Sequence, residues 1–305
     1  MTESDPQTTP KETKREVLSN TKSSRPEGKW RFSLADIAMK FSMLKQGDRF
    51  TAPAAGADGD WIIKLPDSVY PQVPINEHAM MEFARSSGLD VPETRLVHRD
   101  ELDDIPSGLW PANEDFAYAV KRFDRRSNGR RVHIEDFAQI RSIYPHEKYQ
   151  GSFETIGSLV YRGRDASSLV EFAKRLAFII LIRNGDAHLK NWSLIYDNPR
   201  IPRLSPAYDM VATSIYRPLN QPEDLGLKFG KSRDFQTVSL SNFSRLQRKV
   251  RAADVDLASE VQGLVEQACS TWPKIADLLE EYALFLLLND LKKELNARAA
   301  FLLRK

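Results

Sequence analysis

The chain has few of the features that mark special classes of protein. Cysteine occurs once among 305 residues, at Cys269, and histidine occurs five times. A single thiol cannot form an internal disulfide, and so few ligands make a structural zinc cluster unexpected. The longest apolar runs, Leu176–Ile182 and Tyr282–Leu288, hold seven residues each, far below the roughly 18 that cross a bilayer. We therefore expect no disulfide, no zinc cluster and no contact with the interior of a membrane.

The N-terminus and the charge balance narrow the classes further. The start MTESDPQTTP lacks the basic residues and the apolar stretch of a secretory signal, so a cytoplasmic location is expected. Lys and Arg number 44 against 42 Asp and Glu, a net charge of +2, whereas direct nucleic-acid binding usually needs a strong basic excess. With 41% hydrophobic and 28% charged residues, the composition is that of a soluble globular protein.

Local patterning predicts a tail followed by two lobes of an α+β fold. Residues 1–28 hold ten charges, three prolines and only three apolar side chains, too few to offset the entropy cost of ordering, so we interpret them as a flexible, disordered tail. Residues 29–125 are expected to form a small lobe of several strands and one helix. Residues 126–305 are expected to form a mainly helical lobe.

The expected elements follow from apolar periodicity and from turn residues. The predicted strands are Asp60–Leu65, 94–98, 116–123, Trp192–Tyr196 and Ile201–Ser205, the last two joined by a turn at residues 197–199. A helix is predicted over Asn76–Ser87 with Gly88 at its C-terminus, and a wide apolar stripe predicts a buried helix over Ser168–Arg183. Beyond about Leu240 the pattern is helical to the end, and we find no internal repeat.

The segment Asn184–Asn191, NGDAHLKN, carries the first chemical signal. Asp186 and Asn191 have the D-x-x-x-x-N spacing of a kinase catalytic loop, and Asp209 follows eighteen residues later, after the expected strand pair. In that chemistry the first aspartate accepts a proton from the attacking hydroxyl, while Asn191 and Asp209 would bind magnesium. The alternatives are a polar capping turn for the loop and a helix N-cap for Asp209.

Lys64 ends the expected strand WIIK, which has the form of a kinase strand whose lysine contacts nucleotide phosphates. Glu77, on the following helix, is the candidate ion-pair partner. A lysine that ends an apolar strand is otherwise an edge residue with its amine in water. In the loop, Lys190 is placed to neutralise phosphate charge, whereas a histidine such as His188 is often purely structural. No G-x-G-x-x-G precedes Lys64, and the segment Phe32–Ser42 contains no glycine, which excludes an ordinary protein-kinase lobe.

Taken together, these segments resemble the HipA family of bacterial serine/threonine kinases, which act as toxins in toxin–antitoxin systems. The resemblance covers most of residues 30–270 and rests on NGDAHLKN, SPAYD, KRFDRR, IIKLPDS, the pair Asn76–Glu77 and FSLADIAMKFS. It implies the two-lobed kinase fold of that family, with ATP and Mg²⁺ as cofactors and Asp186 as general base. It also implies an ATP site made of Ala35, Asp36, Ile37, Ala38, Met39 and Lys40 over the phosphates, Lys64, the hinge Lys121, Arg122 and Phe123, the loop residues His188, Leu189, Lys190 and Asn191, and finally Tyr208 and Asp209.

The family resemblance also implies regulation. The leading serine of the phosphate-covering loop is an autophosphorylation site in the family, and here that serine is Ser33, with Ser42 as the local rival. The chain departs from the family pattern where a glycine is replaced by Asp36 and a glutamine by Ala38. A carboxylate beside phosphates repels them, so Asp36 favours weakened nucleotide affinity or turnover.

The family also supplies the expected partners. These are a helix-turn-helix antitoxin through which DNA is reached, a separate small protein resembling an N-terminal subdomain that this short form lacks, and an aminoacyl-tRNA synthetase as phosphorylation target, with arrest of translation and growth. Three other interpretations stay open: a small-molecule phosphotransferase, an inactive kinase-like binding module, and direct DNA binding through the basic run Arg245–Arg251. A solvated helix face accounts for that run more simply.

Overall fold

The computed structural model describes residues 39–53, 59–103, 105–111, 113–218, 220–221 and 223–304. The expected tail at residues 1–28 lies outside this part, as do Ser33, Ala35, Asp36, Ile37 and Ala38. The described residues belong to one compact unit. No helix in the described ranges combines the length and the apolar character needed to traverse a bilayer.

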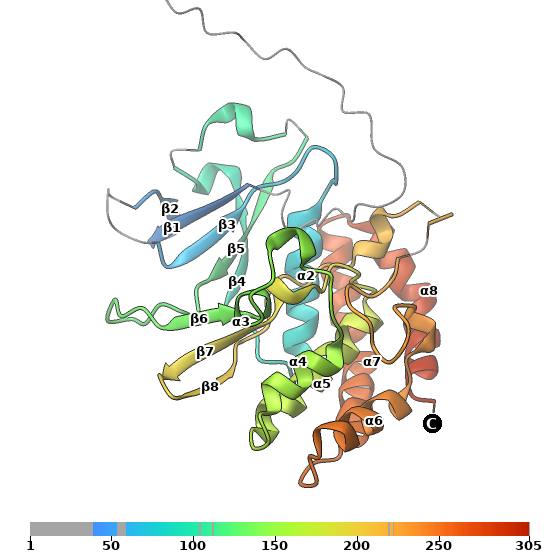
Figure 1. The fold of residues 1–305 in the computed structure, drawn as a ribbon. Coiled ribbons are helices and arrows are strands. Elements are labelled where there is room, and N and C mark those ends of the chain that lie inside the picture. Colours follow the sequence, from blue (N-terminus) through green and yellow to red (C-terminus); the bar gives the residue numbers. More distant parts are fainter. Residues whose placement is uncertain are drawn as a thin grey trace, which may run out of the picture. The chain divides into compact units, whose positions relative to one another are not determined.

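A five-stranded antiparallel sheet occupies the N-terminal half of the described chain (Figure 1). Its strands stand in the order β2-β1-β3-β5-β4. Their bounds are β1 Lys40–Gln46, β2 Arg49–Thr51, β3 Trp61–Lys64, β4 Thr94–His98 and β5 Phe116–Lys121. The predicted strands at residues 60–65, 94–98 and 116–123 are thus confirmed to within a residue or two at each end. The three-residue strand β2 has no periodicity that a sequence could reveal, and it forms because it pairs with β1.

The two faces of this sheet have different surroundings because successive side chains of a strand alternate. Trp61 and Ile63 of β3 pack with Ala117 and Ala119 of β5 in a small apolar core on one face. Ile62 and Lys64 point to the other face, where their cross-strand neighbours are Val120 and Tyr118. The alternation therefore sends the ammonium group of Lys64 to the face opposite the small core.

Helix α2 (Val73–Ser86) follows β3 and packs against β4 and β5. The predicted helix begins three residues too late, since Pro74 in the first turn is itself a helix-start signal that periodicity alone overlooks. Its predicted end is confirmed, because Gly88 has φ +88°, a conformation that glycine adopts without strain just after a helix.

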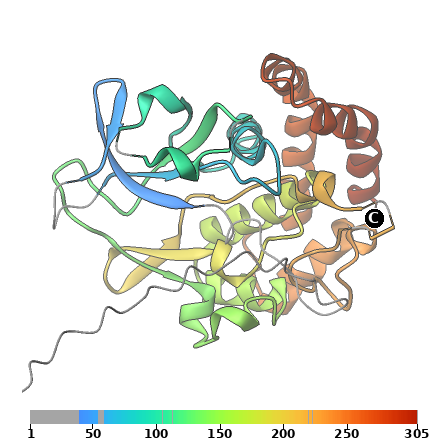
Figure 2. The same ribbon diagram turned by 90° about the horizontal axis from the view of Figure 1, so that it is seen from above.

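The C-terminal half of the chain is mainly helical, as predicted. Its helices are α3 Phe137–Ile140, α4 Phe153–Tyr161, α5 Ala166–Leu181, α6 Leu240–Val250, α7 Leu257–Glu281 and α8 Phe285–Leu302. Figure 2 shows the helices gathered beside the two sheets, with α5 running between them and α7. Helix α5 is the buried helix expected from the apolar stripe, and eleven of its sixteen residues are buried.

A second sheet, with strand order β6-β7-β8, lies next to the helices. The predicted strand pair is confirmed as β7 (Ser193–Asn198) and β8 (Ile201–Leu204), with the turn at residues 199–200, slightly later than expected. Strand β6 (His133–Asp136) was not predicted. Its sequence HIED has no apolar alternation, and it is a strand because His133 through Asp136 pair with Tyr196 through Ser193 of β7.

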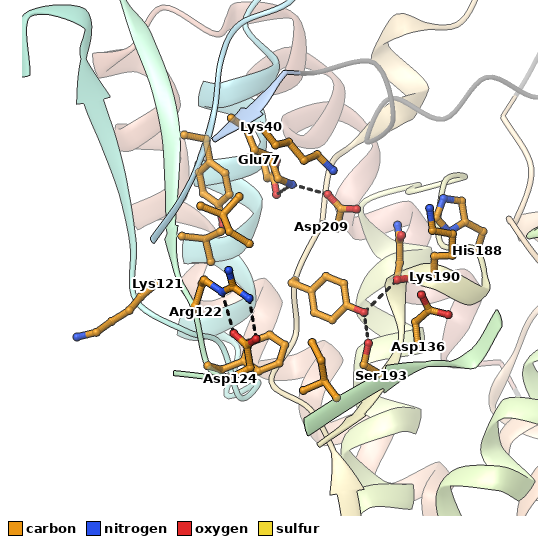
Figure 3. Close-up of a pocket in the computed structure, with 18 of the residues that line it drawn as sticks. Lys40, Glu77, Lys121, Arg122, Asp124, Asp136, His188, Lys190, Ser193 and Asp209 are labelled. Atoms are coloured by element: carbon orange, nitrogen blue, oxygen red, sulfur yellow. Dashed lines mark hydrogen bonds and ion pairs between the residues drawn. The ribbon is translucent and has the colours of Figure 1, made fainter. Parts of the chain in front are cut away.

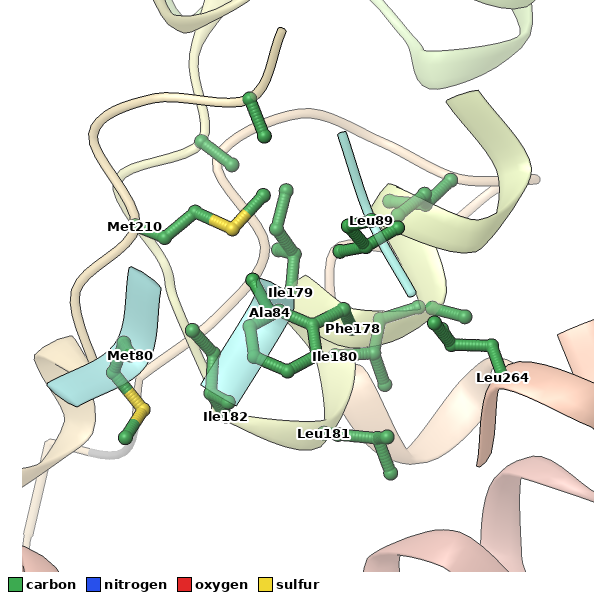
Figure 4. Close-up of a cluster of buried hydrophobic side chains, with 14 of the residues drawn as sticks. Met80, Ala84, Leu89, Phe178, Ile179, Ile180, Leu181, Ile182, Met210 and Leu264 are labelled. Carbon is green, nitrogen blue, oxygen red and sulfur yellow. The ribbon is translucent and has the colours of Figure 1, made fainter. Parts of the chain in front are cut away.

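One large apolar core joins α2 to the helical half. Figure 4 shows Met80 and Ala84 of α2 close to the C-terminal end of α5, together with Leu89 and Leu264. All of these residues belong to the same buried cluster. The helix that carries Glu77 and the helix that leads into residues 184–191 are therefore held by a single core.

Candidate active site

Lys64, Glu77 and Asp209 meet in a buried ionic cluster. The Lys64 Nζ lies 2.5 Å from Oε1 of Glu77 and 2.5 Å from Oδ1 of Asp209. Lys64 is 8% exposed and Glu77 is 2% exposed. The predicted Lys64–Glu77 ion pair is present, and the alternative of an edge lysine in water is wrong. Asp209 follows β8 in a stretch without regular structure, where its φ is +63°, and no α-helix begins at the next residue, so it does not cap one.

The cluster holds one cation and two carboxylates, and the pKa directions reflect that imbalance. Burial acts to lower the pKa of Lys64, but Asp209 and Glu77 outweigh it and raise the pKa above its usual value. Burial raises the pKa of Glu77 to about 7, although Lys64 opposes this. Burial opposes the ionisation of Asp209 as well, yet the charges of Lys64 and Lys40 hold its pKa well below its usual range. A further cation beside Asp209 would be stabilised by the remaining negative charge.

The loop Asn184–Asn191 forms a tight, buried turn directly after α5. Its backbone is held by the Asn184 Oδ1, which accepts from Asp186 N at 2.9 Å, and by the Asn191 Nδ2, which donates to the Asp186 carbonyl at 2.9 Å. The Asn184 Nδ2 donates to the carbonyl of Asp209 at 3.4 Å. These bonds place the predicted base and the two predicted metal ligands in one neighbourhood.

A cavity of about 300 Å³ lies between the face of the five-stranded sheet that carries Lys64 and the loop 184–191. Figure 3 shows the side chains that surround it. The predicted residues that line it are Lys40, Lys64, Glu77, Lys121, Arg122, Phe123, His188, Lys190, Asn191, Tyr208 and Asp209. Eleven residues chosen from the sequence therefore meet at one cavity, although they come from six separate stretches of chain.

Some predicted residues do not line the cavity. Leu189 is fully buried in the large apolar core, so its assignment to the ATP site is corrected to a packing role. Met39 lies beside β1 with its side chain 47% exposed and does not line the cavity. Asp186 is also absent from the lining, and its carboxylate accepts a hydrogen bond from Tyr149 Oη. The positions 33 and 35–38 of the expected phosphate-covering loop lie outside the described residues.

Of the predicted hinge residues Lys121, Arg122 and Phe123, two already use their backbone N–H groups within the protein. The Lys121 N–H donates to the Glu93 carbonyl at 2.9 Å, and the Arg122 N–H donates to the Asp60 carbonyl at 2.8 Å. Two of the three N–H groups are therefore already used by the sheet, which leaves that of Phe123 as the candidate donor. The Arg122 side chain points to Asp124, with Nη2 2.8 Å from Oδ2 (Figure 3), and the Lys121 side chain points out of the cavity.

Several cavity residues were not predicted. They are Ile62, Tyr118, Val120, Asp124, Ile134, Asp136, Gln139 and Ser193. Ile62, Tyr118 and Val120 could have been found from Lys64, because they occupy the same sheet face by alternation and register. Asp136 and Gln139 could not, since they arrive through β6 and α3.

The oxygen ligands fit a magnesium ion of the type that nucleotides carry. Asn191 and Asp209 both line the cavity and offer a carboxamide and a carboxylate oxygen. Lys64 engages Oδ1 of Asp209, which leaves Oδ2 toward a cation. Magnesium is usually held by one or two such protein ligands together with substrate phosphates and water. Within the described ranges, no group of three His, Cys, Asp or Glu side chains forms a metal site of its own.

Gly226 packs closely against the backbone of the loop 184–191. A Cβ at position 226 would lie 2.8 Å from the backbone carbon and oxygen of Ala187, whereas one at Gly263 of α7 would meet nothing within 4 Å. We expect Gly226→Ala to lower the free energy of unfolding by about 1–3 kcal/mol. Gly263→Ala should leave it unchanged or raise it by up to about 1 kcal/mol. Urea unfolding of both variants checks this, and equal stabilities would contradict it.

Comparison with known proteins places this geometry in context. The family model described as HipA-like C-terminal domain matches residues 32–274. A Sinorhizobium fredii protein named "Putative kinase Y4dM" is 39% identical over 267 residues, which are 83% of this chain and 64% of that protein. A Haemophilus influenzae protein named "Putative kinase" is 29% identical over 203 residues, which are 63% of this chain and 56% of that protein. This chain thus spans about three fifths of the length of these curated relatives.

Two solved structures share the fold. HipA of Shewanella oneidensis, in a toxin–antitoxin complex with HipB and operator DNA, has a TM-score of 0.72 at 21% identity and covers 90% of this chain and 65% of its own. The Helicobacter pylori proinflammatory kinase CtkA has a TM-score of 0.51 at 13% identity, covering 85% and 87% respectively. At these identities the likeness shows the architecture alone, and it confirms the predicted kinase-like two-lobed fold.

Proposed function

Because the chain belongs to the HipA-like C-terminal domain family, we propose that it is a protein kinase that transfers the γ-phosphate of ATP to a serine or threonine hydroxyl. The observation that carries this proposal is the buried contact of Lys64 with both Glu77 and Asp209 at the cavity. A lysine held by two carboxylates is costly to bury. Its place in the cavity that Lys40, Lys190 and Asn191 also line supports a nucleotide as ligand, because the carboxylates favour a magnesium ion and the lysines offset phosphate charge.

The cavity offers separate regions for the parts of a nucleotide. Ile62, Val120 and Phe123 form an apolar wall for a base, with the Phe123 N–H as a donor to its edge. Lys40, Lys64 and Lys190 line the polar end, where their charges would offset those of the phosphates. Asn191 and Asp209 would hold magnesium there, and the ion would neutralise charge that develops on the transferred group.

The proposed transfer is a single displacement at the γ-phosphorus. The acceptor hydroxyl oxygen forms a bond to phosphorus, the bond from phosphorus to the β-bridging oxygen breaks, and ADP leaves. The acceptor proton passes to the carboxylate of Asp186. The loop bonds to Asn184 and Asn191 fix the backbone of Asp186 while this happens, so the protein contributes mainly by positioning and by charge.

The biological role is proposed from the same family membership. We propose that the chain acts as the toxin of a toxin–antitoxin pair, bound by a helix-turn-helix antitoxin and reaching DNA only through it. The complex of Shewanella HipA with HipB and operator DNA supports this partner class. An aminoacyl-tRNA synthetase as target, a small protein partner and a location in the cytoplasm remain predictions.

Ser33 is proposed as the autophosphorylation site in preference to Ser42. The Ser42 Oγ accepts a hydrogen bond from Gly59 N at 3.1 Å within the sheet region, where it is half-buried. A hydroxyl so engaged is a poor acceptor of phosphate. Mapping of the phosphorylated position by mass spectrometry decides between the two serines.

The proposed function is tested by incubating the purified chain with γ-labelled ATP, alone and with a bacterial lysate. With magnesium, we expect label on the chain itself or on a discrete lysate protein, and none after chelation with EDTA. Asp209→Asn should also abolish labelling, because it weakens both the metal site and the contact with Lys64. Label transferred only to an added small alcohol would instead favour a small-molecule phosphotransferase. ATP binding without any transfer would favour the inactive binding module.

A further inference from the structure

A tyrosine that the sequence did not indicate contacts the carboxylate of Asp186. The Tyr149 Oη donates a hydrogen bond to the Asp186 Oδ1, across 37 residues of sequence. A phenol keeps its proton near neutral pH, so Tyr149 is the donor and the carboxylate is the acceptor. We infer that Tyr149 is a positioning residue, which holds the Asp186 carboxylate in the orientation that accepts the proton of the incoming hydroxyl. The inference rests on the proposed function and assigns one more residue to it.

The position of Tyr149 does not depend on its hydroxyl. Its ring meets the ring of His188 edge-on, with 5.2 Å between the centroids. The Arg233 Nη2 donates to the Tyr149 carbonyl at 2.6 Å. The preceding residue, Lys148, is buried, and its carbonyl accepts a hydrogen bond from Leu189 N at 3.1 Å. A phenylalanine at position 149 would therefore keep the ring in place and remove the hydroxyl that contacts Asp186.

The backbone of Asp186 is held by bonds that do not involve its carboxylate. Its N–H donates to the Asn184 Oδ1, and its carbonyl accepts from His188 N at 2.8 Å and from Asn191 Nδ2 at 2.9 Å. None of these bonds restrains the last torsion of the aspartate, which has broad minima. The hydrogen bond from Tyr149 restrains it, because it fixes where Oδ1 lies.

The orientation of a general base matters because it must lie within hydrogen-bond reach of the proton that it accepts. A displacement of about 1 Å can cost on the order of a hundredfold in rate. Tyr149 does not line the cavity. Removal of the Tyr149 hydroxyl should therefore slow phosphoryl transfer and leave nucleotide affinity unchanged. A general loss of structure would lower both.

The test compares the full chain with Tyr149→Phe and with a control, Tyr144→Phe. Tyr144 lies in the same segment, is 70% exposed and stacks on His146. The readouts are the rate of label transfer at saturating ATP, the ATP dissociation constant and the urea midpoint. We expect Tyr149→Phe to transfer at least about tenfold more slowly with ATP affinity within twofold of the unaltered chain. Tyr144→Phe should match the unaltered chain in every readout.

Two results would overturn the inference while the proposed function stands. One is transfer by Tyr149→Phe at the unaltered rate. The other is a slower rate accompanied by an equal loss of ATP affinity or of stability, which would give Tyr149 a purely structural role. Absence of transfer by the unaltered chain is a separate outcome, and it would overturn the proposed function together with this inference.

Discussion

Replacing Lys64 with methionine should lower the free energy of unfolding by about 3–5 kcal/mol, the effect of removing one partner of a buried ion pair. Lys64 is the cation between Glu77 and Asp209, each 2.5 Å away, and all three side chains are at least nine-tenths buried. Without it, two buried carboxylates would face each other, and the exposed Lys40 would be left as the cation that acts on both. One of them would have to take up a proton.

The matched control for this prediction is Lys121→Met. Lys121 also belongs to the five-stranded sheet, but its amine and the partner Glu93 are both 52% exposed, at an N–O distance of 3.1 Å. Exposed pairs contribute up to about 1 kcal/mol. Urea unfolding at pH 7 measures both variants. Equal losses of stability would contradict the view that burial makes the Lys64 cluster special.

The second large effect is expected for Asp186→Asn, which should slow phosphoryl transfer by a factor of about 10²–10⁴. The amide has the shape of the carboxylate but cannot accept the proton of the attacking hydroxyl. Its oxygen can still accept the hydrogen bond from Tyr149 Oη, and the backbone bonds to Asn184 and Asn191 do not involve the side chain. Stability and ATP binding should therefore be retained.

Labelled-ATP transfer and ATP binding, measured on the same preparations, check this prediction. Asp197→Asn is a suitable control, since Asp197 lies in β7, is 37% exposed, and pairs with Arg203 at 3.2 Å on the surface. That variant should transfer at the unaltered rate. If Asp186→Asn also transferred at that rate, the proton would have to go elsewhere and the role of Asp186 would be wrong.

The Lys64–Glu77 pair illustrates how much local patterning can establish. The strand WIIK and the helix that follows are both encoded by short-range periodicity. A strand and a helix that are adjacent in sequence usually pack together, so the pairing of a lysine on one with a glutamate on the other follows from the amino-acid sequence. The short loop NGDAHLKN was interpretable for the same reason, because its two functional residues lie only five positions apart.

The register of the sheet added what the strand pattern alone left open. The alternation of side chains in β3 predicts that Ile62 and Lys64 share a face of the sheet. It does not predict which face of the sheet is solvated. Pairing of β3 with β5 brings Val120 and Tyr118 beside them. The large core then places the loop 184–191 opposite that face, and the cavity results from the two together.

Other contacts depend on chain segments that meet only in the folded protein. Lys64 and Asp209 are 145 residues apart, and Tyr149 reaches Asp186 across 37 residues from a region without regular structure. Strand β6 has no strand pattern of its own and exists because β7 offers it hydrogen-bonding partners. Leu189 shows that a motif position can also mislead. The motif suggested a ligand contact for Leu189, whereas packing placed its side chain in the core.

The sequence by itself thus determined many of the strands and helices, the two-lobed class and the residue types of the candidate site, because these follow from periodicity, short motif spacing and family resemblance. Only the tertiary structure decided which charges share a buried cluster, which face of the sheet lines the cavity and which tyrosine restrains Asp186. Such contacts join segments far apart in the chain. Their free energy comes from burial and charge pairing that exist only once the core has formed.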